Sequence, residues 1–208
     1  MPYLILIRHG QSEYNAQGLW TGLTDISLND EGREEARRSA DALRDVPIDI
    51  AFTSTLKRAH QTLDEILEAL GKTDLRIIQD AALNERDYGD LTGKNKWKIR
   101  DEYGEEQFVK WRRSWDYPIP NGESLKDVHA RVVPYYEQKI VPELGAGRNV
   151  LVVAHGNSLR ALVKHLEHIS DEDIPAVELG TGEVYLYQVD PSGRVLSKEV
   201  RAVNPNVV

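Results

Sequence analysis

The hydrophobic positions of this chain follow two patterns, short continuous aliphatic runs and longer stretches with apolar residues three and four apart. The first pattern is typical of buried strands and the second of amphipathic helices. The aliphatic runs predict strands at 3–7 (YLILI), 48–54 (IDIAFTS), 75–79 (LRIIQ) and 149–154 (NVLVVA). The helical patterns lie at 27–46, 56–71, 124–144 and 158–169. Two later runs separated by DPSGR predict a hairpin of antiparallel strands, at 183–189 and 195–200.

Strands alternate with helices through most of the chain, and this order predicts an α/β fold. We expect a three-layer sandwich, in which a mainly parallel sheet with an antiparallel strand carries helices on both faces. The sequence contains no linker, low-complexity segment or convincing repeat, so residues 1–208 are expected to form a single domain.

Local signals place several boundaries within this order. Asn29 is positioned to cap a helix, and Ser124 with Asp127 forms a capping-box pattern. Pro134 lies inside the helix that follows, where it predicts a kink. The remaining segments are expected to be a polar loop at 80–95, a charged helix at 96–115 and a turn at 117–123.

The composition limits the classes of protein that the chain can belong to. With 40% hydrophobic and 29% charged residues, the chain has the balance of a globular protein. The absence of cysteine excludes a disulfide framework, a thiolate nucleophile and a cysteine-based metal site. No run approaches the roughly 18 apolar residues of a transmembrane helix. No basic segment precedes the first aliphatic run, so no signal peptide is expected. We therefore expect a cytoplasmic protein without a membrane partner.

The net charge of −8 argues against nucleic acid as a partner, because such binding needs a basic face. One stretch, 94–113, has the opposite sign, since it holds seven lysines and arginines against four acidic residues. A local basic cluster of this kind leaves room for a small anionic ligand.

Two His-Gly pairs directly follow aliphatic runs, in RHGQSEYN at the first strand and AHGNSLR at the fourth. Ligands of open α/β sheets bind at the carboxyl ends of the strands, so His9 and His155 are expected at that edge. Helix N-termini follow and favour an anion there. Arg8 and Arg58 add guanidinium groups suited to phosphate. The sequence therefore predicts a site for a phosphoryl group.

Simpler explanations exist for most of these histidines, and several competing motifs are incomplete. A lone histidine at a strand end is usually a hydrogen-bonded structural residue, and His60 and His129 have no special placement. His165 and His168 are spaced for a metal, but without a neighbouring ligand motif a solvated helix face is favoured. GDLTGKN departs from a P-loop in its spacing, and no G-x-G-x-x-G or hydrolase elbow is present.

Six blocks of the chain together resemble a known family. They are LIRHGQSEYN, TSTLKRAHQT, LNERDYGDLTGKNK, KWRRSWD, GESL and VAHGNSLRALVKHL. The chain resembles the histidine phosphatase superfamily, and more narrowly the 2,3-bisphosphoglycerate-dependent phosphoglycerate mutases, from about residue 3 to about residue 190. The RHG opening is typical of the whole superfamily, whereas LNERDYG, NK and WRR in this order are typical of the mutases.

The resemblance implies a role for each matching residue. His9 would be the nucleophile that becomes phosphohistidine, Glu85 would be the general acid and base, and Arg8, Arg58 and His155 would surround the phosphoryl oxygens. Imidazole is suited to act as a neutral nucleophile, and cationic side chains can replace a metal in phosphoryl transfer. The substrate-binding residues would be Arg8, Gly10, Gln11, Ser12, Asn15, Thr21, Gly22, Arg58, Glu85, Arg86, Tyr88, Lys96, Arg112, Arg113, Gly156 and Asn157.

The residues alone leave some of these assignments open. They do not distinguish Glu85 from the other loop acids, Asp80, Asp87 and Asp90. For the pair Arg112–Arg113, the alternative is a solvated helix face. The adjacent tryptophans, Trp111 and Trp115, are expected to be core or rim anchors.

The resemblance also implies a function. The chain would be an isomerase of glycolysis and gluconeogenesis that interconverts 3-phosphoglycerate and 2-phosphoglycerate. It would work through phosphohistidine, with 2,3-bisphosphoglycerate as priming cofactor and no metal, as a homodimer or other homo-oligomer. The alternatives are a broad phosphatase of the same superfamily and a non-catalytic protein that binds a phosphorylated ligand.

The chain is shorter than many mutases at two places. It has only YPIPN between WRRSWD and GESL, and it ends at RAVNPNVV, without their extra segment and long tail. Cover of the site excludes water from a phosphoryl intermediate. We therefore expect a working mutase with measurable phosphatase leakage.

Overall fold

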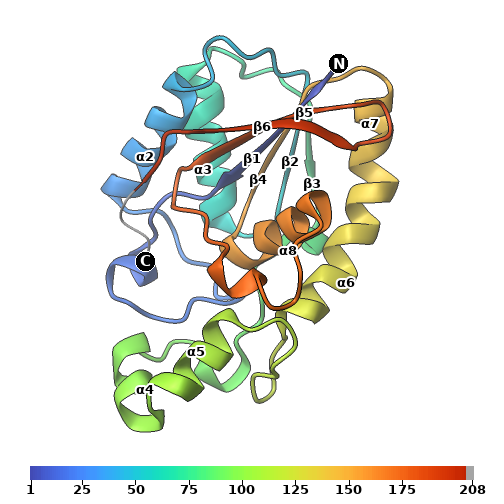
Figure 1. Cartoon of the computed structure of the whole chain (residues 1–208). Coiled ribbons are helices and arrows are strands. Elements are labelled where there is room, and N and C mark those ends of the chain that lie inside the picture. Colours follow the sequence, from blue (N-terminus) through green and yellow to red (C-terminus); the bar gives the residue numbers. More distant parts are fainter. Residues whose placement is uncertain (205–208) are drawn as a thin grey trace.

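A six-stranded sheet forms the centre of the computed structural model, which describes residues 1–204 (Figure 1). Four neighbouring strands of this sheet are parallel, and the last two strands in the sequence pair antiparallel with their neighbours. Side by side, the strands are β3 (Ile77–Gln79), β2 (Ile50–Thr53), β4 (Val150–Ala154), β1 (Tyr3–Arg8), β5 (Val184–Val189) and β6 (Val195–Arg201). The predicted mainly parallel sheet with an antiparallel element is confirmed.

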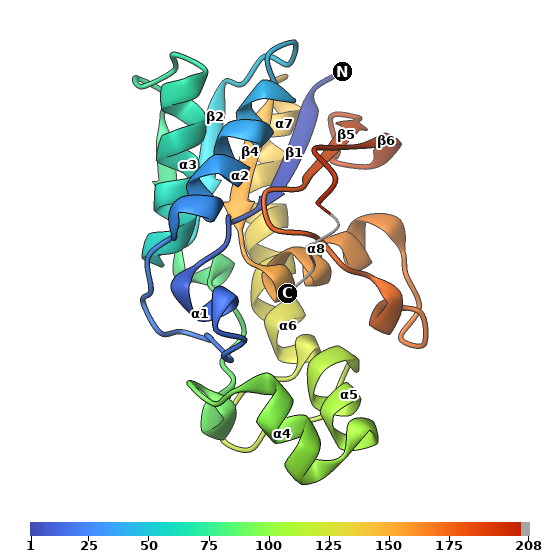
Figure 2. The same cartoon turned by 90° about the vertical axis from the view of Figure 1, so that its left-hand side faces the viewer.

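Alternate residues of the central strands face opposite layers of helices. The helices of these layers are α2 (Asp30–Asp41), α3 (Lys57–Ala69), α6 (Leu125–Tyr135) and α8 (Gly156–Glu167). Leu4 and Leu6 of β1 belong to the core cluster shared with α6 and α8, whereas Ile5 and Ile7 belong to the cluster shared with α2 and α3. The period of two along a strand therefore separates the two cores. Figure 2 shows the sheet between these layers, which confirms the three-layer sandwich.

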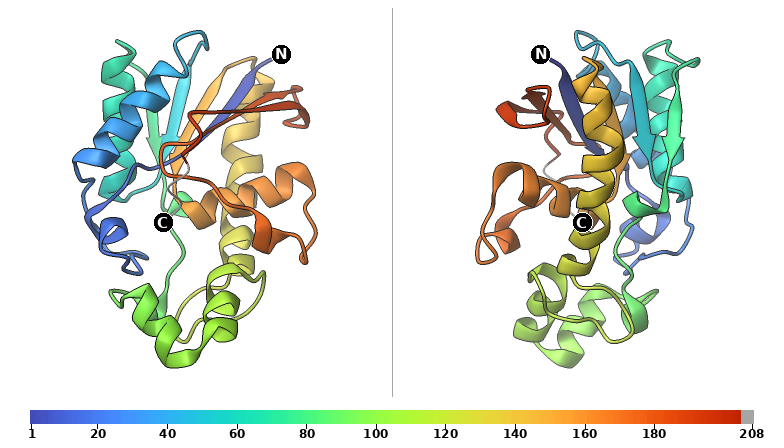
Figure 3. Two further views of the ribbon diagram at one scale, coloured as in Figure 1. Left: turned by 60° about the vertical axis from the view of Figure 1, so that its left-hand side comes forward. Right: turned by 90° about the vertical axis from the view of Figure 1, so that its right-hand side faces the viewer.

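Two short helices, α4 (Lys96–Tyr103) and α5 (Glu105–Arg113), form a cap beyond the carboxyl ends of the parallel strands. Figure 3 shows them, in green, set apart from the sheet. They enclose a separate apolar cluster that includes Trp20, Phe108 and Trp111. Because Trp20 comes from the connection between β1 and α2, this cluster ties the cap to the main body.

The structure divides the predicted helix at 96–115 into two. Gly104 has a φ of 84°, a conformation that a helix interior does not contain, and it separates α4 from α5. The predicted polar loop at 80–95 contains two 3₁₀ turns, η1 (Ala81–Leu83) and η2 (Gly89–Leu91). The prediction missed these features because both depend on single turns with little periodicity.

The helical caps agree with the sequence, and Pro134 lies inside α6 as predicted. Asn29 accepts a hydrogen bond from the Gly32 amide, and Ser124 and Asp127 form the reciprocal capping box. Helix α6 continues through Pro134, and the irregularity follows it as a π-helical segment. The shorter elements are η3 (Tyr136–Ile140), α7 (Val141–Gly145), η4 (Ile174–Ala176) and α1 (Glu13–Ala16). Among residues 1–204, no helix is long and apolar enough to cross a membrane.

We propose that the chain folds as one domain, and its tryptophans allow a direct test. Trp20 and Trp111 belong to the cap cluster and the Trp97 ring contacts the Phe108 ring, so most tryptophan fluorescence reports the cap. Far-ultraviolet circular dichroism reports all helices and strands. We expect the two thermal unfolding curves to coincide, as they do in two-state unfolding. A fluorescence transition that precedes the loss of ellipticity would show that the cap unfolds separately.

Candidate active site

The pairing of β1 with β4 places the two predicted histidines side by side. Arg8 lies opposite Ala154 in the parallel register, and the His9 amide donates to the Ala154 carbonyl at 2.9 Å. The next residue on β4 is His155, and the His9 and His155 rings lie with their centroids 4.9 Å apart. Both rings are buried. The sequence prediction that these residues meet at one edge of the sheet is confirmed.

The hydrogen bonds of His9 define which ring nitrogen carries a lone pair. Nδ1 lies 2.7 Å from the Gly10 carbonyl, which can only accept, so Nδ1 carries the proton. Nε2 accepts a hydrogen bond from Arg58 Nε at 3.2 Å. Burial, followed by the charges of Arg58 and Arg8, holds the pKa of His9 well below its usual range. His9 is therefore a neutral imidazole with its Nε2 lone pair available as a nucleophile.

His155 offers a donor instead. Its Nε2 lies 2.7 Å from the Ser54 hydroxyl, and the Ser54 oxygen accepts from the Leu56 amide at 3.1 Å. A Ser54 hydroxyl that donates to Nε2 leaves the ring proton on Nδ1, and this is the tautomer that would offer a donor to an anion. Nδ1 is buried, and within residues 1–204 nothing accepts its hydrogen bond. Burial, with the charge of Arg58 next, lowers the pKa of His155 well below its usual value.

The arginines supply positive charge at the same place. Arg58 is fully buried and donates to the carbonyls of Gly22 and Thr24, each at 2.9 Å. Burial lowers the pKa of Arg58 to about 10, which still leaves it charged at neutral pH. Arg8 donates through NH1 to the Leu179 carbonyl at 2.7 Å. Arg8 Nε and Thr21 Oγ1 are buried without a partner in the described chain, so a bound anion would satisfy them.

Glu85 is the loop acid whose geometry fits proton transfer. Its Oε1 accepts hydrogen bonds from the Arg86 amide at 2.8 Å and from the backbone and side chain of Asn157 at 3.1 Å. No donor within residues 1–204 contacts Oε2, which leaves that oxygen to exchange a proton. The other acids serve local structure, since Asp80 caps η1 and Asp87 accepts from the Gly89 amide.

These groups line one cleft between the strand ends and the cap. Of the predicted residues, the lining contains Arg8, His9, Asn15, Thr21, Arg58, Glu85, Tyr88, Lys96, Arg112, Arg113, Gly156 and Asn157. The predicted residues outside the lining are Gly10, Gln11, Ser12, Gly22, Arg86 and His155. The lining residues that the sequence prediction missed are Leu19, Trp20, Arg160, Glu178 and Leu179.

His155 lies beside the His9 ring, and the other predicted residues outside the lining support the residues that line the cleft. The Gly10 amide donates to Thr62 Oγ1, and a side chain at Gly10 would lie 2.1 Å from the Gly32 carbonyl oxygen. Ser12 caps α1 and holds Asn15, and the Gly22 carbonyl accepts from Arg58. The Arg86 guanidinium carbon lies 4.7 Å from the Tyr88 ring centroid, and Arg86 donates to the Trp111 carbonyl.

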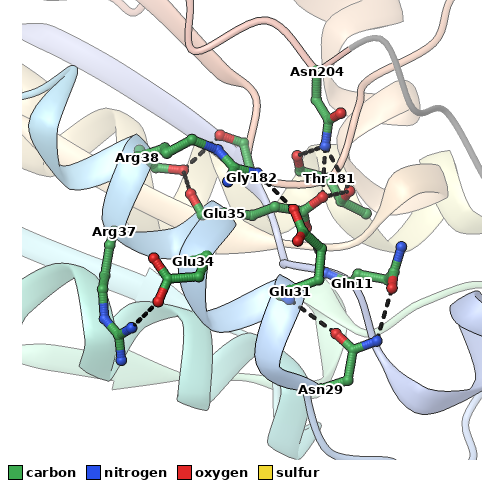
Figure 4. Close-up of polar contacts among 12 residues, drawn as sticks. Gln11, Asn29, Glu31, Glu34, Glu35, Arg37, Arg38, Thr181, Gly182 and Asn204 are labelled. Carbon is green, nitrogen blue, oxygen red and sulfur yellow. Dashed lines mark hydrogen bonds and ion pairs between the residues drawn. The ribbon is translucent and has the colours of Figure 1, made fainter.

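A buried carboxylate fixes the loop that follows the nucleophile (Figure 4). Glu35 Oε2 accepts from the Gln11 amide at 2.6 Å, and Oε1 accepts from Thr181 Oγ1 at 2.8 Å and Asn204 Nδ2 at 2.6 Å. The neighbouring Gly182 amide donates to the Arg8 carbonyl at 3.0 Å. Glu35 thus ties the His9 loop to two later segments. The Gln11 side chain is turned toward Asn29, whose Nδ2 donates to Gln11 Oε1 at 2.7 Å.

The cap adds three more cationic side chains to the cleft lining, Lys96 from α4 and Arg112 and Arg113 from α5. Burial, with the Arg112 charge next, lowers the pKa of Lys96 to about 7. Arg112 and Arg113 keep side-chain exposures of 20% and ion-pair with Glu178, at 3.9 and 2.7 Å. A pair that lines a cleft in this way does not fit the alternative of a solvated helix face. Trp111 is buried as a core anchor.

Arg160 and Glu178 are the charged lining residues that the sequence prediction missed. Arg160 donates to Asn157 Oδ1 and to the Arg113 carbonyl, both at 3.0 Å, and so connects the floor of the cleft to the cap. Burial lowers the pKa of Arg160 to about 9. Its place one turn after Asn157 was a usable signal. Glu178 lies in an irregular connection, where no sequence periodicity predicts direction.

His165 and His168, which are spaced for a metal, have other local contacts in the structure. His168 ends α8 in the left-handed conformation, and His165 Nε2 lies 3.9 Å from Glu137. In the part of the chain that is described, no three metal-binding side chains gather at one point.

Comparisons with known proteins agree with the geometry. The model of the histidine phosphatase superfamily (branch 1) matches residues 4–200. A 2,3-bisphosphoglycerate-dependent phosphoglycerate mutase of Cytophaga hutchinsonii is 54% identical over 188 residues, covering 90% of this chain and 88% of the relative. The enzyme with the same name from Mesorhizobium japonicum is 52% identical over 199 residues, covering 95% and 97%.

Solved structures share the fold at lower identity. YhfR of Bacillus stearothermophilus superposes with a TM-score of 0.82 at 28% identity, covering 100% of this chain and 98% of that one. A mycobacterial glucosyl-3-phosphoglycerate phosphatase has a TM-score of 0.82 at 26% identity, covering 98% and 100%.

The protonation state of His9 can be measured directly. Because the pKa of His9 is lowered, its ring should be neutral at about pH 6.5, where an ordinary histidine is half protonated. Long-range ¹H–¹⁵N correlation spectra should show the proton on Nδ1 and an unprotonated Nε2, with the signals assigned by their loss in His9→Ala. A doubly protonated ring, or a proton on Nε2, would contradict this assignment.

Proposed function

The chain belongs to the histidine phosphatase superfamily, and we propose that it is the isomerase of this superfamily that interconverts 3-phosphoglycerate and 2-phosphoglycerate through phosphohistidine at His9. Relatives named for this activity match about nine-tenths of the chain or more at about half identity. The observation that carries the proposal is the His9 Nε2 lone pair, which faces a buried set of cations and unpaired donors.

The first step loads the nucleophile. His9 Nε2 forms a bond to the phosphorus of the donor as the bond from phosphorus to the leaving oxygen breaks, and Glu85 protonates that oxygen. Arg58 Nε, now on Nε2 at 3.2 Å, moves its hydrogen bond to a phosphoryl oxygen. Arg8 Nε and His155 Nδ1 donate to the other oxygens. Donors placed in advance, in a buried site, stabilise the charge that spreads over the phosphoryl oxygens.

The second step returns the phosphoryl group to a different hydroxyl. The 2-hydroxyl of 3-phosphoglycerate attacks the phosphohistidine, its proton passes to Glu85, and the bond from phosphorus to His9 breaks, which forms 2,3-bisphosphoglycerate as the intermediate. After this intermediate reorients, the first step is repeated with its 3-phosphoryl group, which reloads His9 and releases 2-phosphoglycerate. Positioned acid–base groups contribute typically about 10²–10⁴-fold to such steps. Lys96, Arg112 and Arg113 would hold the carboxylate and the second phosphate while the intermediate reorients.

The cleft fits 2,3-bisphosphoglycerate as the priming donor. Its cations come from two parts of the fold, with Arg8 and Arg58 at the strand ends and Lys96, Arg112 and Arg113 on the cap. A ligand with two phosphates and a carboxylate would match this double set of cations. The donor would supply one phosphoryl group from a phosphate monoester, and the protein residues would do the rest without a metal.

The cellular setting and assembly complete the proposal. We place the activity in the cytoplasm, where glycolysis and gluconeogenesis use phosphoglycerates, and in a homodimer or other homo-oligomer. The family resemblance supports both assignments, and neither rests on the geometry of the cleft.

The function is tested by following two products separately. With 3-phosphoglycerate as substrate, 2-phosphoglycerate should form only when 2,3-bisphosphoglycerate is present, with a smaller release of free phosphate. Brief incubation with labelled 2,3-bisphosphoglycerate should leave one acid-labile phosphate per chain, which His9→Ala loses and the control His165→Ala keeps. Free phosphate as the main product would favour the broad phosphatase, and label retained in His9→Ala would exclude His9 as the carrier.

Substrate binding should take up a proton at Lys96. In the free protein the pKa of Lys96 is about 7, so at about pH 8 this side chain is mostly neutral. A bound anion favours the ammonium form and raises that pKa, while the substrate phosphate, with a second pKa near 6, is already ionised. Binding should therefore tighten as the pH falls from about 8 to about 7.

Calorimetry in two buffers of different ionisation enthalpy measures this uptake. With 3-phosphoglycerate at about pH 8, the wild type should take up more protons than Lys96→Arg, by a difference approaching one, because arginine stays charged throughout. Equal uptake by the two proteins would show that Lys96 does not titrate with the ligand.

A further inference from the structure

We propose that Arg131 is a positioning residue for Glu85, which it aligns from outside the cleft by holding the backbone of the loop that carries the acid. Arg131 lies on α6, and it is not among the residues that line the cleft. This inference rests on the proposed function, in which Glu85 moves the proton.

The guanidinium of Arg131 binds three carbonyls of one short segment. NH1 donates to the Ala82 carbonyl at 2.8 Å and to the Asn84 carbonyl at 2.9 Å. NH2 donates to the carbonyl of Glu85 itself at 3.0 Å. This segment leaves η1 in an extended conformation at Asn84, so its carbonyls are not held by a continuing helix. Arg131 replaces those missing backbone hydrogen bonds.

Glu123 pairs with Arg131 and binds the loop on the C-terminal side of Glu85. It accepts from Arg131 Nε at 2.9 Å and from Arg131 NH2 at 3.0 Å. The same carboxylate accepts from the Asp87 amide at 2.9 Å, and the Glu123 amide donates to the Asp87 carbonyl at 2.9 Å. The Arg131–Glu123 pair therefore binds the loop both before and after Glu85.

Arg131 donates as many hydrogen bonds as an arginine side chain has N–H groups. A guanidinium has five N–H donors in a rigid planar fork, and here five hydrogen bonds leave Arg131. A lysine has three donors on one nitrogen and cannot reproduce this planar arrangement. The pair is also partly exposed, with side-chain exposures of 25% and 26%, so it is not a core anchor. A role in aligning the Glu85 loop explains why an arginine occupies this position of α6.

Loss of the hydrogen bonds from Arg131 to this loop should slow the proton transfer more than the phosphoryl transfer. Glu85 Oε1 keeps its contacts with Asn157, but the backbone that directs Oε2 toward the leaving oxygen becomes free to shift. A displacement of about 1 Å in a catalytic group can lower the rate by about 10²-fold. His9 and its surrounding arginines do not contact Arg131, so the nucleophile stays in place.

The dependence on the leaving group separates these two effects. Phenyl phosphate releases a basic oxygen that needs a proton, whereas p-nitrophenyl phosphate releases a stable anion that needs little help. The kcat/KM for each ester reports the step in which His9 is phosphorylated. The readout is the ratio of kcat/KM for phenyl phosphate to that for p-nitrophenyl phosphate, measured in each variant.

We expect Arg131→Lys to lower this ratio by about 10-fold or more, within the range that misplacement of an acid allows. Glu123→Gln, which weakens the same pair and is less disruptive, should lower it in the same direction by less. Glu85→Gln is the benchmark and should lower it most. Arg148→Lys, at an exposed arginine paired with Glu143, is the matched control and should leave the ratio unchanged.

The outcomes distinguish the two proposals. A lowered ratio in both Glu85→Gln and Arg131→Lys, with unchanged thermal unfolding of Glu123→Gln, supports the positioning role. A lowered ratio in Glu85→Gln alone, with equal losses on both esters in Arg131→Lys, means that Arg131 is merely structural and overturns this inference. An unchanged ratio in Glu85→Gln would instead show that the proposed acid is wrong, and the positioning role would be refuted with it.

Discussion

The parallel pairing of β1 with β4 is the constraint on which the rest of the site depends. The register that sets Arg8 opposite Ala154 makes the next residue on each strand a histidine, and the two rings meet at 4.9 Å. Both strands are buried on both faces, so a one-residue slip would exchange the side chains that pack into the two cores, Leu4 and Leu6 in one and Ile5 and Ile7 in the other. The packing that stabilises the sheet therefore also fixes the distance between His9 and His155. The helix that begins directly after β4 adds the positive end of its dipole at the same point.

Burial then determines the chemistry of these side chains. The same aliphatic walls that exclude water lower the pKa of both histidines, with the buried Arg58 as a second cause for each. Because the imidazole is neutral, it can lie beside the guanidinium groups of Arg58 and Arg8 without charge repulsion. The fold leaves Arg8 Nε and His155 Nδ1 buried and without partners in the described chain, which is unfavourable until an anion arrives. A bound phosphoryl group would give both atoms a hydrogen-bond partner.

The sequence predicted those parts of the structure that depend on local periodicity. Aliphatic runs located β1 and β4, and the residues directly after them, His9 and His155, followed from the rule that sites lie at strand ends. The family resemblance selected Glu85 where the loop pattern could not. What failed was the direction of side chains in irregular segments. Gln11 was predicted in the ligand site, but its side chain accepts a hydrogen bond from Asn29 and is not part of the cleft lining, and Glu178 was missed although it lines the cleft. Such directions are set by contacts between distant segments, which no local pattern records.

The central claim is that His9 Nε2, Arg8 Nε and His155 Nδ1 converge on one phosphoryl group. Orthovanadate tests it most directly, because it mimics the five-coordinate geometry of phosphoryl transfer. A crystal structure of the protein with orthovanadate should show vanadium bonded to His9 Nε2, with equatorial oxygens in hydrogen-bond contact with Arg8 Nε and His155 Nδ1. Vanadium bonded to another side chain, or an equatorial plane that neither donor reaches, would contradict the account.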